Sequence, residues 1–392
     1  MNTVPNSIVV LGASLAGLSA VRALREKGFA GRLVVAGSEQ SLPYDRPPLS
    51  KEFLTGDLTD EDLLLMNSDD DTLDVEWRLN RTATGLVRSP DGIHRVTFDD
   101  GSHFDADAVV VATGARARTL PGHSGLAGVH TLRSVDDARA LRDSLSRAQN
   151  LVIVGAGFIG AEVASTAARM SLNVTVVEAS PTPLAGPLGI ELGAICAGQH
   201  AAHGVRLLTG AVVAALLGDD AVEAVQLSDG TILPADAVVV GIGAVPNVEW
   251  ASDSELMIED GFLTDPSCRT NVPGVYAIGD CARTFDDAHQ VHHRSEHWSN
   301  AVAQAATVAD TIMATPSGPA AIPYFWSHQY GKMLQFAGTR HSTDEVRFVD
   351  GDPGTGTFVA TYDRDGDTVG VFAMNSPRLF TRYKKQLARS RA

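Results

Sequence analysis

Three glycines in the stretch IVGAGFIGAE, residues 153–162, have the spacing of a dinucleotide-binding turn. In the pattern G-x-G-x-x-G, Gly155 permits a tight turn, Gly157 lets the backbone approach a pyrophosphate, and Gly160 lets the helix lie close to the strand. Glu178 ends the next apolar segment, at about the 20-residue spacing expected of an acid that binds a ribose 2′-hydroxyl. These residues predict a site that holds phosphates at a helix N-terminus.

A similar stretch, VVLGASLAGL at residues 9–18, opens the chain. It has Gly12 and Gly17 at the outer positions and Ser14 at the middle position, and Glu39 follows the next apolar run. Serine is small, so it hinders the approach of a pyrophosphate only slightly. The sequence therefore predicts two dinucleotide sites. Two such cofactors in one chain indicate an electron relay, in which a nicotinamide delivers a hydride and a flavin holds it.

Both sites need the same supporting elements. An apolar strand enters each glycine turn, a helix follows over residues 18–27 or 161–170, and a second apolar strand ends in the acid. Two later segments, DGSHFDADAVVVATGA (100–115) and DGTILPADAVVVGIGA (229–244), repeat an Asp-Gly turn, an Ala-Asp-Ala and a valine-rich strand. This order of strand, helix and parallel strand predicts an α/β fold with two doubly wound dinucleotide-binding domains.

The composition excludes several classes of function. The chain has 392 residues, of which 44% are hydrophobic and 20% charged, so it is long enough for two or three domains with full cores. The net charge of −16 argues against nucleic acid or an anionic membrane as a general partner. No apolar run reaches the roughly 20 residues of a membrane span. The N-terminus also lacks the features of a signal peptide, so we expect a cytoplasmic location.

Neither the cysteines nor the histidines predict a metal site. The histidines of HQVHHRSEH, residues 289–297, lack helical spacing with a matching acid. The cysteines occur singly, without the paired spacing of a metal or redox motif. We expect all three thiols, Cys196, Cys268 and Cys281, to be buried.

Four further segments carry a resemblance to a known family. They are LPYDRPPLSKEFL (42–54), GVYAIGDCA (274–282), RSEHW (294–298) and PYFWSHQYGKMLQFAG (323–338). With the two glycine patterns, they resemble the ferredoxin reductases that serve Rieske oxygenases and haem-thiolate monooxygenases, over essentially the whole chain. The resemblance implies that the first site binds FAD and the second binds NAD(P)H.

The resemblance also implies a glutathione-reductase-like architecture of three domains. A discontinuous FAD-binding domain would comprise residues 1–115 and 245–320, and a NAD-binding domain would comprise residues 116–244. A C-terminal α+β domain would comprise residues 321–392. The cofactor-binding residues expected on this basis are Gly12, Ser14, Leu15, Ala16, Gly17, Glu39, Arg46, Lys51, Ala112, Thr113, Gly114, Gly155, Gly157, Phe158, Ile159, Gly160, Glu178, Gly243, Gly279, Asp280, Glu296, His297, Trp298 and Trp326.

Some of these residues have a second interpretation. The family places Arg46 and Lys51 along the flavin, and it places Asp280 against a ribityl hydroxyl. An Asp that follows the segment VYAIG can also cap a helix. The family places Trp298 and Trp326 near the isoalloxazine, whereas burial statistics favour tryptophan as a core residue.

Lys51 and Glu162 are the expected catalytic residues. The resemblance implies that they form an ion pair at the flavin face. Glu162 lies two residues after the third glycine, so it can neutralise a lysine that is otherwise costly to bury. An acid in the first turn of a helix also stabilises the helix dipole, which leaves a structural role for Glu162 open.

The absence of cysteine from residues 40–60 indicates the electron acceptor. Disulfide reductases of similar architecture place a redox pair there. Without a thiol relay the flavin must pass its electrons outward, and it can release them singly. This suits one-electron acceptors. The resemblance implies that the acceptor is an iron-sulfur ferredoxin, of the 2Fe-2S type, which serves a terminal oxygenase, and that the protein is a monomer. The alternatives are NADH oxidase, monodehydroascorbate reductase and a non-catalytic flavoprotein of the apoptosis-inducing-factor type.

Three further features concern specificity. His328 stands where the family usually has Asp, and LAGPLG (184–189) has Gly-Pro where relatives often carry Arg. No Lys or Arg lies between Glu178 and His203 to receive a 2′-phosphate, so we expect NADH to be preferred over NADPH.

The C-terminal residues 376–392 are rich in cations and contain no acid. Four of these cations recur at helical steps and would form one basic face of a helix: Arg378, Arg382, Lys385 and Arg389. Such a face would orient an acidic ferredoxin. A solvated or frayed terminus is the alternative.

Overall fold

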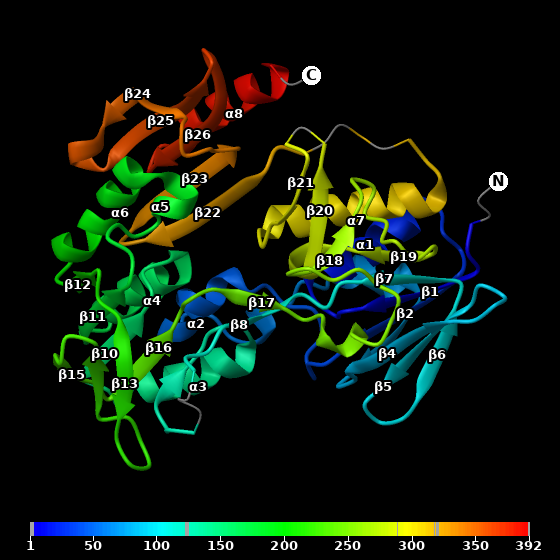
Figure 1. The fold of residues 1–392 in the computed structure, drawn as a ribbon, viewed down its shortest axis with the longest axis horizontal. Coiled ribbons are helices and arrows are strands. Elements are labelled where there is room, and N and C mark those ends of the chain that lie inside the picture. Colours follow the sequence, from blue (N-terminus) through cyan, green and yellow to red (C-terminus); the bar gives the residue numbers. More distant parts are fainter. Residues whose placement is uncertain (1–3, 122–124, 288, 317, 319–320, 391–392) are drawn as a thin grey trace. The chain divides into compact units, whose positions relative to one another are not determined.

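The computed structural model describes residues 4–121, 125–287, 289–316, 318 and 321–390. The chain divides into two compact units, which are described separately (Figure 1). The first unit comprises Met1–Asp45, Leu63–Arg116 and Val245–Ala321. The second comprises Arg46–Asp62, Ala117–Ala244 and Ile322–Ala392.

The first unit is built on a parallel sheet with the strand order β19-β7-β1-β2-β3. Its central strands are buried on both faces, as is usual for parallel sheets. Helices α1 and α7 cover one face, and the antiparallel sheet β4-β5-β6 covers the other. The elements are β1 (Ser7–Leu11), α1 (Leu15–Glu26), β2 (Arg32–Gly37), β3 (Val75–Leu79), β4 (Ala83–Arg88), β5 (His94–Phe98), β6 (His103–Ala106), β7 (Ala108–Val111), β19 (Val275–Ala277) and α7 (Trp298–Met313).

A small sheet with the order β18-β20-β21 and several short 3-10 helices complete this unit. They are η3 (Ser68–Leu73), η4 (Glu249–Ala251), β18 (Phe262–Thr264), η5 (Gly279–Cys281), β20 (Ala282–Asp286) and β21 (Val291–Arg294). The chain passes between the units near β8 (Ala115–Ala117), β17 (Ala244–Pro246) and η2 (Glu61–Leu63).

The second unit repeats the arrangement with a parallel sheet in the order β12-β11-β10-β16-β9. Helix α4 packs against β10 and β11, and the antiparallel sheet β13-β14-β15 packs on one face of the parallel sheet. The elements are η1 (Pro47–Ser50), α2 (Glu52–Thr55), β9 (Val129–His130), α3 (Val135–Leu145), β10 (Asn150–Val154), α4 (Phe158–Arg169), β11 (Asn173–Glu178), α5 (Ala185–Leu188), α6 (Ile190–Ala202), β12 (Arg206–Thr209), β13 (Val213–Leu217), β14 (Ala224–Leu227), β15 (Ile232–Pro234) and β16 (Ala237–Val240).

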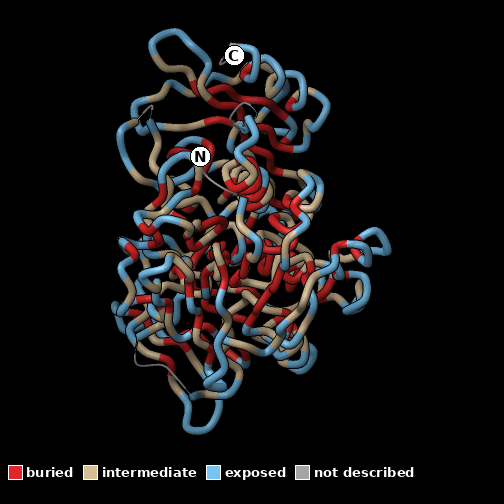
Figure 2. The backbone as a smooth tube through the Cα atoms, turned by 90° about the vertical axis from the view of Figure 1, so that its right-hand side faces the viewer, coloured by how far each residue is buried: buried red, intermediate tan, exposed pale blue. Residues whose placement is uncertain are grey.

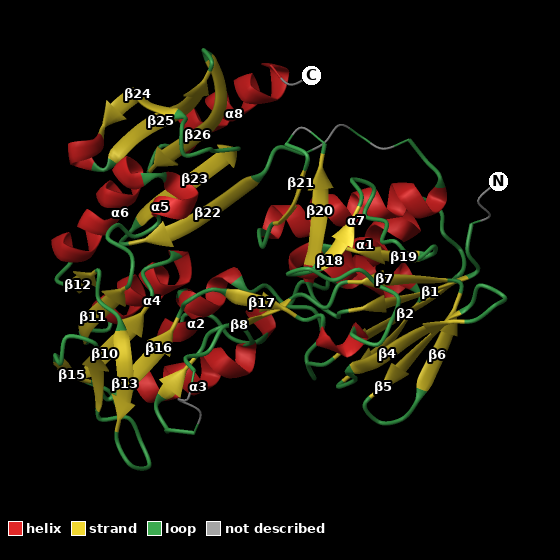
Figure 3. Ribbon diagram, viewed as in Figure 1, coloured by secondary structure: helices red, strands yellow, loops and turns green. Residues whose placement is uncertain are grey.

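The C-terminal residues of the second unit form an antiparallel sheet with the order β22-β23-β26-β25-β24 (Figure 3). Helix α8 packs on one face, whereas α5 and α6 pack on the other. The elements are β22 (Tyr324–Gln329), β23 (Lys332–Gly338), β24 (Glu345–Asp352), η6 (Pro353–Thr355), β25 (Thr357–Arg364), β26 (Asp367–Met374) and α8 (Pro377–Ser390). Buried residues follow the strands of these sheets, and exposed residues follow the turns (Figure 2).

The α/β fold class and the internal repeat are confirmed. The repeated valine segments form β7 and β16, which pair in parallel with β1 and β10, the strands that enter the glycine turns. The two helices begin three residues earlier than predicted, at Leu15 and Phe158, because the third glycine of each pattern lies inside the helix. Within the described residues, no helix is long and apolar enough to cross a membrane.

Candidate active site

The glycine turn of the first unit follows β1. At Gly12, φ is +132°, and an added Cβ would lie 2.0 Å from the carbonyl oxygen of Ala112. At Gly17, an added Cβ would lie 1.9 Å from the carbonyl oxygen of Gly12. Helix α1 starts directly after Ser14, whose side chain makes no capping hydrogen bond among the described residues. The N–H groups of the first turn are therefore left for an anionic group, which fits the pyrophosphate of a dinucleotide.

The glycine turn of the second unit has the same construction. An added Cβ at Gly155, where φ is +101°, would lie 2.3 Å from the carbonyl oxygen of Gly241, and one at Gly160 would lie 2.1 Å from that of Gly155. At Gly157, an added Cβ meets no described atom within 4 Å. The space above Gly157 thus suits a ligand. Phe158 and Ile159 form the first turn of α4 at this site.

The two predicted acids occupy equivalent places but make different contacts. Glu178, at the end of β11, accepts hydrogen bonds from the backbone N–H of Ala156 at 2.8 Å and of Ser180 at 2.7 Å. Its carboxylate therefore lies beside the glycine turn, where a ribose hydroxyl can reach it. Glu39, two residues after β2, accepts a hydrogen bond from the Tyr44 hydroxyl at 2.5 Å.

Gly279 and Asp280 lie beside the first glycine turn. An added Cβ at Gly279 would lie 3.1 Å from the Cβ of Ala16, so the two predicted residues are neighbours. The described caps of η5 and α7 are Ile278 and His297, so Asp280 is not the N-cap of either helix. Burial lowers the pKa of His297, and the nearby charge of Asp280 opposes this shift. Asp280 directly follows Gly279, and its contact with a ligand hydroxyl stays a prediction.

Thr113 and Gly114 follow β7 at the same edge of the sheet. Asn247 fixes both of them: its backbone N–H donates to the carbonyl of Gly114 at 2.9 Å, and its Nδ2 donates to the carbonyl of Thr113 at 2.9 Å. The Thr113 hydroxyl donates in return to the carbonyl of Asn247 at 2.8 Å. The corresponding turn after β16 contains Gly243, where φ is +107° and whose carbonyl accepts from the N–H of Arg118 at 2.9 Å.

The remaining predicted residues are divided between the two units. In the first unit, Glu296 pairs with Arg294, and the indole Nε1 of Trp298 donates to Asp45 Oδ1 at 3.0 Å. In the second unit, Trp326 on β22 stacks on Tyr324, with ring centroids 5.7 Å apart. Trp298 is 38% exposed, which is more than a core tryptophan would be.

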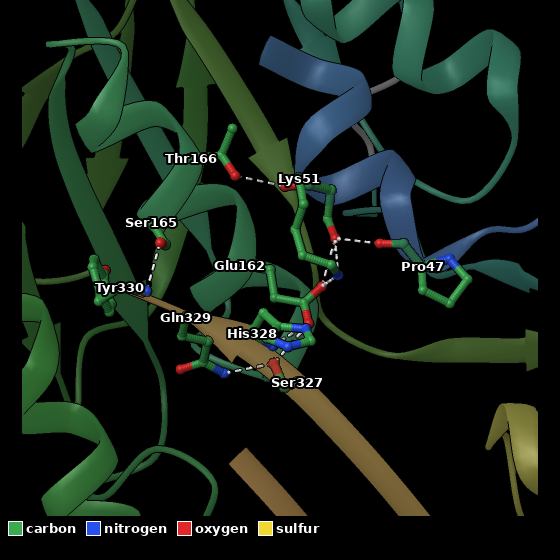
Figure 4. Close-up of polar contacts among 10 residues, drawn as sticks. Pro47, Lys51, Glu162, Ser165, Thr166, Ser327, His328, Gln329 and Tyr330 are labelled. Carbon is green, nitrogen blue, oxygen red and sulfur yellow. Dashed lines mark hydrogen bonds and ion pairs between the residues drawn. The ribbon is translucent and has the colours of Figure 1, made fainter. Parts of the chain in front are cut away.

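Arg46 and Lys51 belong to the second unit. Arg46 donates to the carbonyl of Arg133 at 2.5 Å. Lys51 Nζ lies 2.6 Å from Glu162 Oε2, and the exposed fractions of the two side chains are 12% and 5% (Figure 4). The first turn of α4, which is fully described, contains no acid, so Glu162 is in the ion pair and not at the end of the helix dipole.

Sequence reasoning missed several residues that complete these sites. Asn247, Ser50 and Ser327 contact predicted residues through hydrogen bonds between segments that are far apart in the chain. Arg340 Nη1 donates to the carbonyl of Gly186 at 2.7 Å, so a guanidinium reaches the Gly-Pro segment that follows Glu178. No local pattern marks these contacts. The one signal was the departure at residues 184–189, where the family's arginine is absent.

Comparisons with known proteins agree with this geometry. The pyridine nucleotide-disulphide oxidoreductase family matches residues 6–305, and the reductase C-terminal domain matches residues 324–392. Rhodocoxin reductase from Rhodococcus erythropolis is 37% identical over 97% of this chain and 89% of its own length. The ferredoxin reductase component of chlorobenzene dioxygenase from Cupriavidus sp. (strain PS12) is 38% identical over 95% of this chain and 90% of its own length.

Solved structures extend this agreement to the fold. The covalent complex of putidaredoxin reductase with putidaredoxin contains a chain that matches with a TM-score of 0.92 and 31% identity, over 97% of this chain and 93% of that chain. The chain therefore belongs to the pyridine nucleotide-disulphide oxidoreductase family, in its branch of ferredoxin reductases. It is an oxidoreductase that uses FAD and NAD(P)H, as the two glycine patterns and the resemblance predicted.

The thiols do not provide the redox pair that the family description names. Cys196, Cys268 and Cys281 are all free and buried, as predicted. Burial raises the pKa of Cys196 and of Cys268 to about 12, so neither is a reactive thiolate at neutral pH. The electrons leave this chain by a route other than a disulfide.

Proposed function

We propose that the chain carries electrons from NADH through FAD to an iron-sulfur ferredoxin that serves an oxygenase. The observation that carries this proposal is the combination of two glycine turns with a buried Lys51–Glu162 pair and three buried, unpaired thiols. The relatives support it, because their names describe ferredoxin reductases of dioxygenase and related systems. The nicotinamide supplies a hydride and the flavin releases electrons singly when both are bound.

The two glycine turns define the proposed division of labour. We assign the turn after β1, the acid Glu39 and the Gly279–Asp280 segment to FAD. We assign the turn after β10 and the acid Glu178 to NADH. The domains would then be residues 1–115 with 245–320 for FAD, 116–244 for NADH and 321–392 at the C-terminus. The grouping of residues 46–62 with the second unit reflects packing on α3 and α4, so the cofactor boundaries stay a prediction.

Lys51 would act in the reduction of FAD by NADH. Its ammonium group is nearly buried and is held by Glu162, so its position is fixed and its charge is neutralised. A fixed cation can stabilise negative charge that develops on a bound group. Lys51→Ala should therefore slow anaerobic flavin reduction by NADH in stopped flow by about 100-fold, the scale for one preorganised donor. Unchanged reduction would rule out this role.

The basic face of α8 is the proposed docking surface for the acidic ferredoxin. The structure has a helix over Pro377–Ser390, and the four predicted cations are all exposed on it: Arg378, Arg382, Lys385 and Arg389. Lys384 lies elsewhere, over the Tyr324 ring at 4.0 Å. Arg391 lies outside the described residues. A local basic face on a chain of net charge −16 would orient an acidic partner. A cytoplasmic location, where NADH is supplied, fits this role.

The decisive experiment compares electron acceptors. FAD-loaded protein is mixed with NADH and a 2Fe-2S ferredoxin under anaerobic conditions, and bleaching of the ferredoxin absorbance is followed. We expect catalytic reduction of the ferredoxin with two equivalents per NADH. Oxygen consumption without reduction of the ferredoxin would favour an NADH oxidase. A long-lived reduced flavin that no ferredoxin reoxidises would favour a non-catalytic flavoprotein.

A further inference from the structure

The carboxylate of Glu162 is held by more than its lysine. Glu162 is 4% exposed, and both of its oxygens accept hydrogen bonds (Figure 4). Oε2 accepts from Ser50 Oγ at 2.5 Å as well as from Lys51 Nζ at 2.6 Å. Oε1 accepts from Ser327 Oγ at 2.7 Å. Burial of a carboxylate is costly unless the group is both paired and hydrogen-bonded. The two hydroxyls, together with the lysine, therefore offset the cost of burying Glu162.

The two serine hydroxyls are themselves oriented. Gln329 Nε2 donates to Ser327 Oγ at 3.0 Å, and Lys51 Nζ donates to Ser50 Oγ at 3.1 Å. Each serine oxygen thus accepts one hydrogen bond and donates its own proton to Glu162; for Ser50 the carbonyl of Pro47, at 3.4 Å, is a second and more distant acceptor. Ser50, Ser327 and Gln329 are at most 2% exposed, so water does not compete for these bonds.

The segments that supply the serines are attached to α4 by separate contacts. Thr166 Oγ1 donates to the carbonyl of Ser50 at 2.8 Å, and the backbone N–H of Tyr330 donates to Ser165 Oγ at 2.7 Å. These bonds lie one turn along α4 from Glu162 and do not involve its carboxylate. Loss of a serine hydroxyl therefore need not detach β22 or the segment before α2 from the helix.

We propose that Ser327 and Ser50 are positioning residues, which hold Glu162 in the orientation that pairs with Lys51. The C-terminal sheet would then influence the first step of the reaction, because Ser327 is on its edge strand β22. This inference rests on the role proposed above for Lys51 in flavin reduction. It assigns to the C-terminal sheet a function in addition to any contact with the ferredoxin.

The test measures how readily the amine of Lys51 reacts in the FAD-loaded protein. Trace labelling of lysines with acetic anhydride, read by mass spectrometry from pH 7 to 10, reports how freely each amine reacts. In Ser327→Ala, the labelling of Lys51 should rise about tenfold relative to Lys27, the scale of one hydrogen bond to a charged group. Lys27 is a suitable internal reference because it pairs with Asp310 in the first unit. Ser327→Thr keeps a hydroxyl and should restore the labelling of Lys51. Ser228→Ala removes a hydroxyl of the second unit that donates to the carbonyl of Val212, far along the chain from the segments that hold Glu162, and should leave it unchanged.

Flavin reduction provides the second measurement. Ser327→Ala should slow the reduction of FAD by NADH about tenfold, with little change in the NADH concentration for half-maximal rate. If Lys51 labelling in Ser327→Ala equals that of the parent, the inference is overturned. If labelling rises but flavin reduction is unchanged, the positioning is supported and the role proposed for Lys51 fails. If Ser327→Ala does not fold, Ser50→Ala applies the same test to the other carboxylate oxygen.

Discussion

The two glycine turns differ at one of their three glycine positions, and the difference separates structural glycines from ligand-contact glycines. The first turn has Gly12, Ser14 and Gly17, and the second has three glycines. The outer positions of both turns lie within about 2 Å of a backbone carbonyl when a Cβ is added, at 2.0 and 1.9 Å in the first and 2.3 and 2.1 Å in the second. The protein itself thus requires glycine there. The middle position faces open space at Gly157, so only a bound ligand restricts it.

Two of the carbonyl groups that leave no room for a Cβ at the outer positions belong to the internal repeat. Ala112 follows β7 and Gly241 follows β16, and these strands are equivalent members of the repeat. The repeat strand therefore lies beside the glycine turn in each unit and sets its shape. A serine at the middle of the first turn is compatible with this arrangement, because the equivalent position of the second turn, Gly157, has no described atom within 4 Å of an added Cβ.

The largest effect should come from the outer glycines. Gly12→Ala and Gly155→Ala should each lower the free energy of unfolding of the cofactor-free protein by about 3 kcal/mol or more, because they combine a positive φ with a backbone clash. Gly157→Ala, at an ordinary φ, should change it by no more than about 0.5 kcal/mol. Urea unfolding followed by circular dichroism measures all three. An equal cost for Gly157→Ala and Gly155→Ala would contradict the distinction.

A buried histidine should make the second unit sensitive to acid. His200 on α6 is 2% exposed, and burial lowers its pKa to about 4. Its Nδ1 lies 2.7 Å from the Tyr330 hydroxyl. The unfolded chain binds the proton near pH 6.5 but the folded chain does not, so stability falls as the pH drops from about 6.5 to about 4, by about 3 kcal/mol. Urea unfolding at pH 7 and pH 4.5 should show a smaller loss in His200→Gln.

Two histidines of the first unit provide the comparison for this loss of stability in acid. Burial also lowers the pKa of His94 on β5, so part of the loss should persist in His200→Gln. His103→Gln alters an exposed histidine on β6 and serves as the control. If His200→Gln and His103→Gln lose the same stability as the parent over this range, His200 does not carry the effect.

Glu178 and Glu39 should differ in their effect on the choice between NADH and NADPH. Glu178 lies beside the second glycine turn, where it would bind a ribose 2′-hydroxyl and repel a 2′-phosphate. The parent should use NADH at least about tenfold more efficiently than NADPH, and Glu178→Ala should remove about that factor. Glu39→Ala should leave the ratio of catalytic efficiencies unchanged, because its site would hold FAD. Equal catalytic efficiencies of the parent with NADH and NADPH would contradict this prediction.

Arg340 provides a further test of the preference between NADH and NADPH. It donates to the carbonyl of Gly186, in the segment after Glu178, so it supplies this segment with a cation that the local sequence lacks. In the Glu178→Ala background, Arg340→Gln should reduce the use of NADPH more than the use of NADH, because it removes a charge that can bind a 2′-phosphate. An unchanged ratio would show that Arg340 only holds the backbone of Gly186.

The sequence predicted what depends on local pattern. Glycine spacing, the repeated Asp-Gly and valine segments and the basic periodicity of residues 376–390 were sufficient for the fold class, both turns and α8. It did not predict contacts between distant segments, such as Ser327 with Glu162 or Arg340 with Gly186. Such contacts depend on how β22 and β23 dock on α4 and α5, and no spacing along the chain encodes that docking. The grouping of residues 46–62 with the second unit has the same origin.

The smallest effect should come from α8, which belongs to the second unit and has no counterpart in the repeat. The double substitution Arg382→Glu and Lys385→Glu should raise the KM for ferredoxin about fivefold at low salt, because it reverses the steering charge. The effect should fade as ionic strength rises, since such forces are screened beyond about 8 Å at physiological salt. Ferricyanide reduction should be unaffected, because it needs no docked protein. Arg88→Glu with Arg147→Glu makes the same change in net charge at exposed positions outside α8, and it should leave the KM nearly unchanged. If both double variants raise the KM equally, total charge and not the α8 face governs the encounter, and the docking surface lies elsewhere.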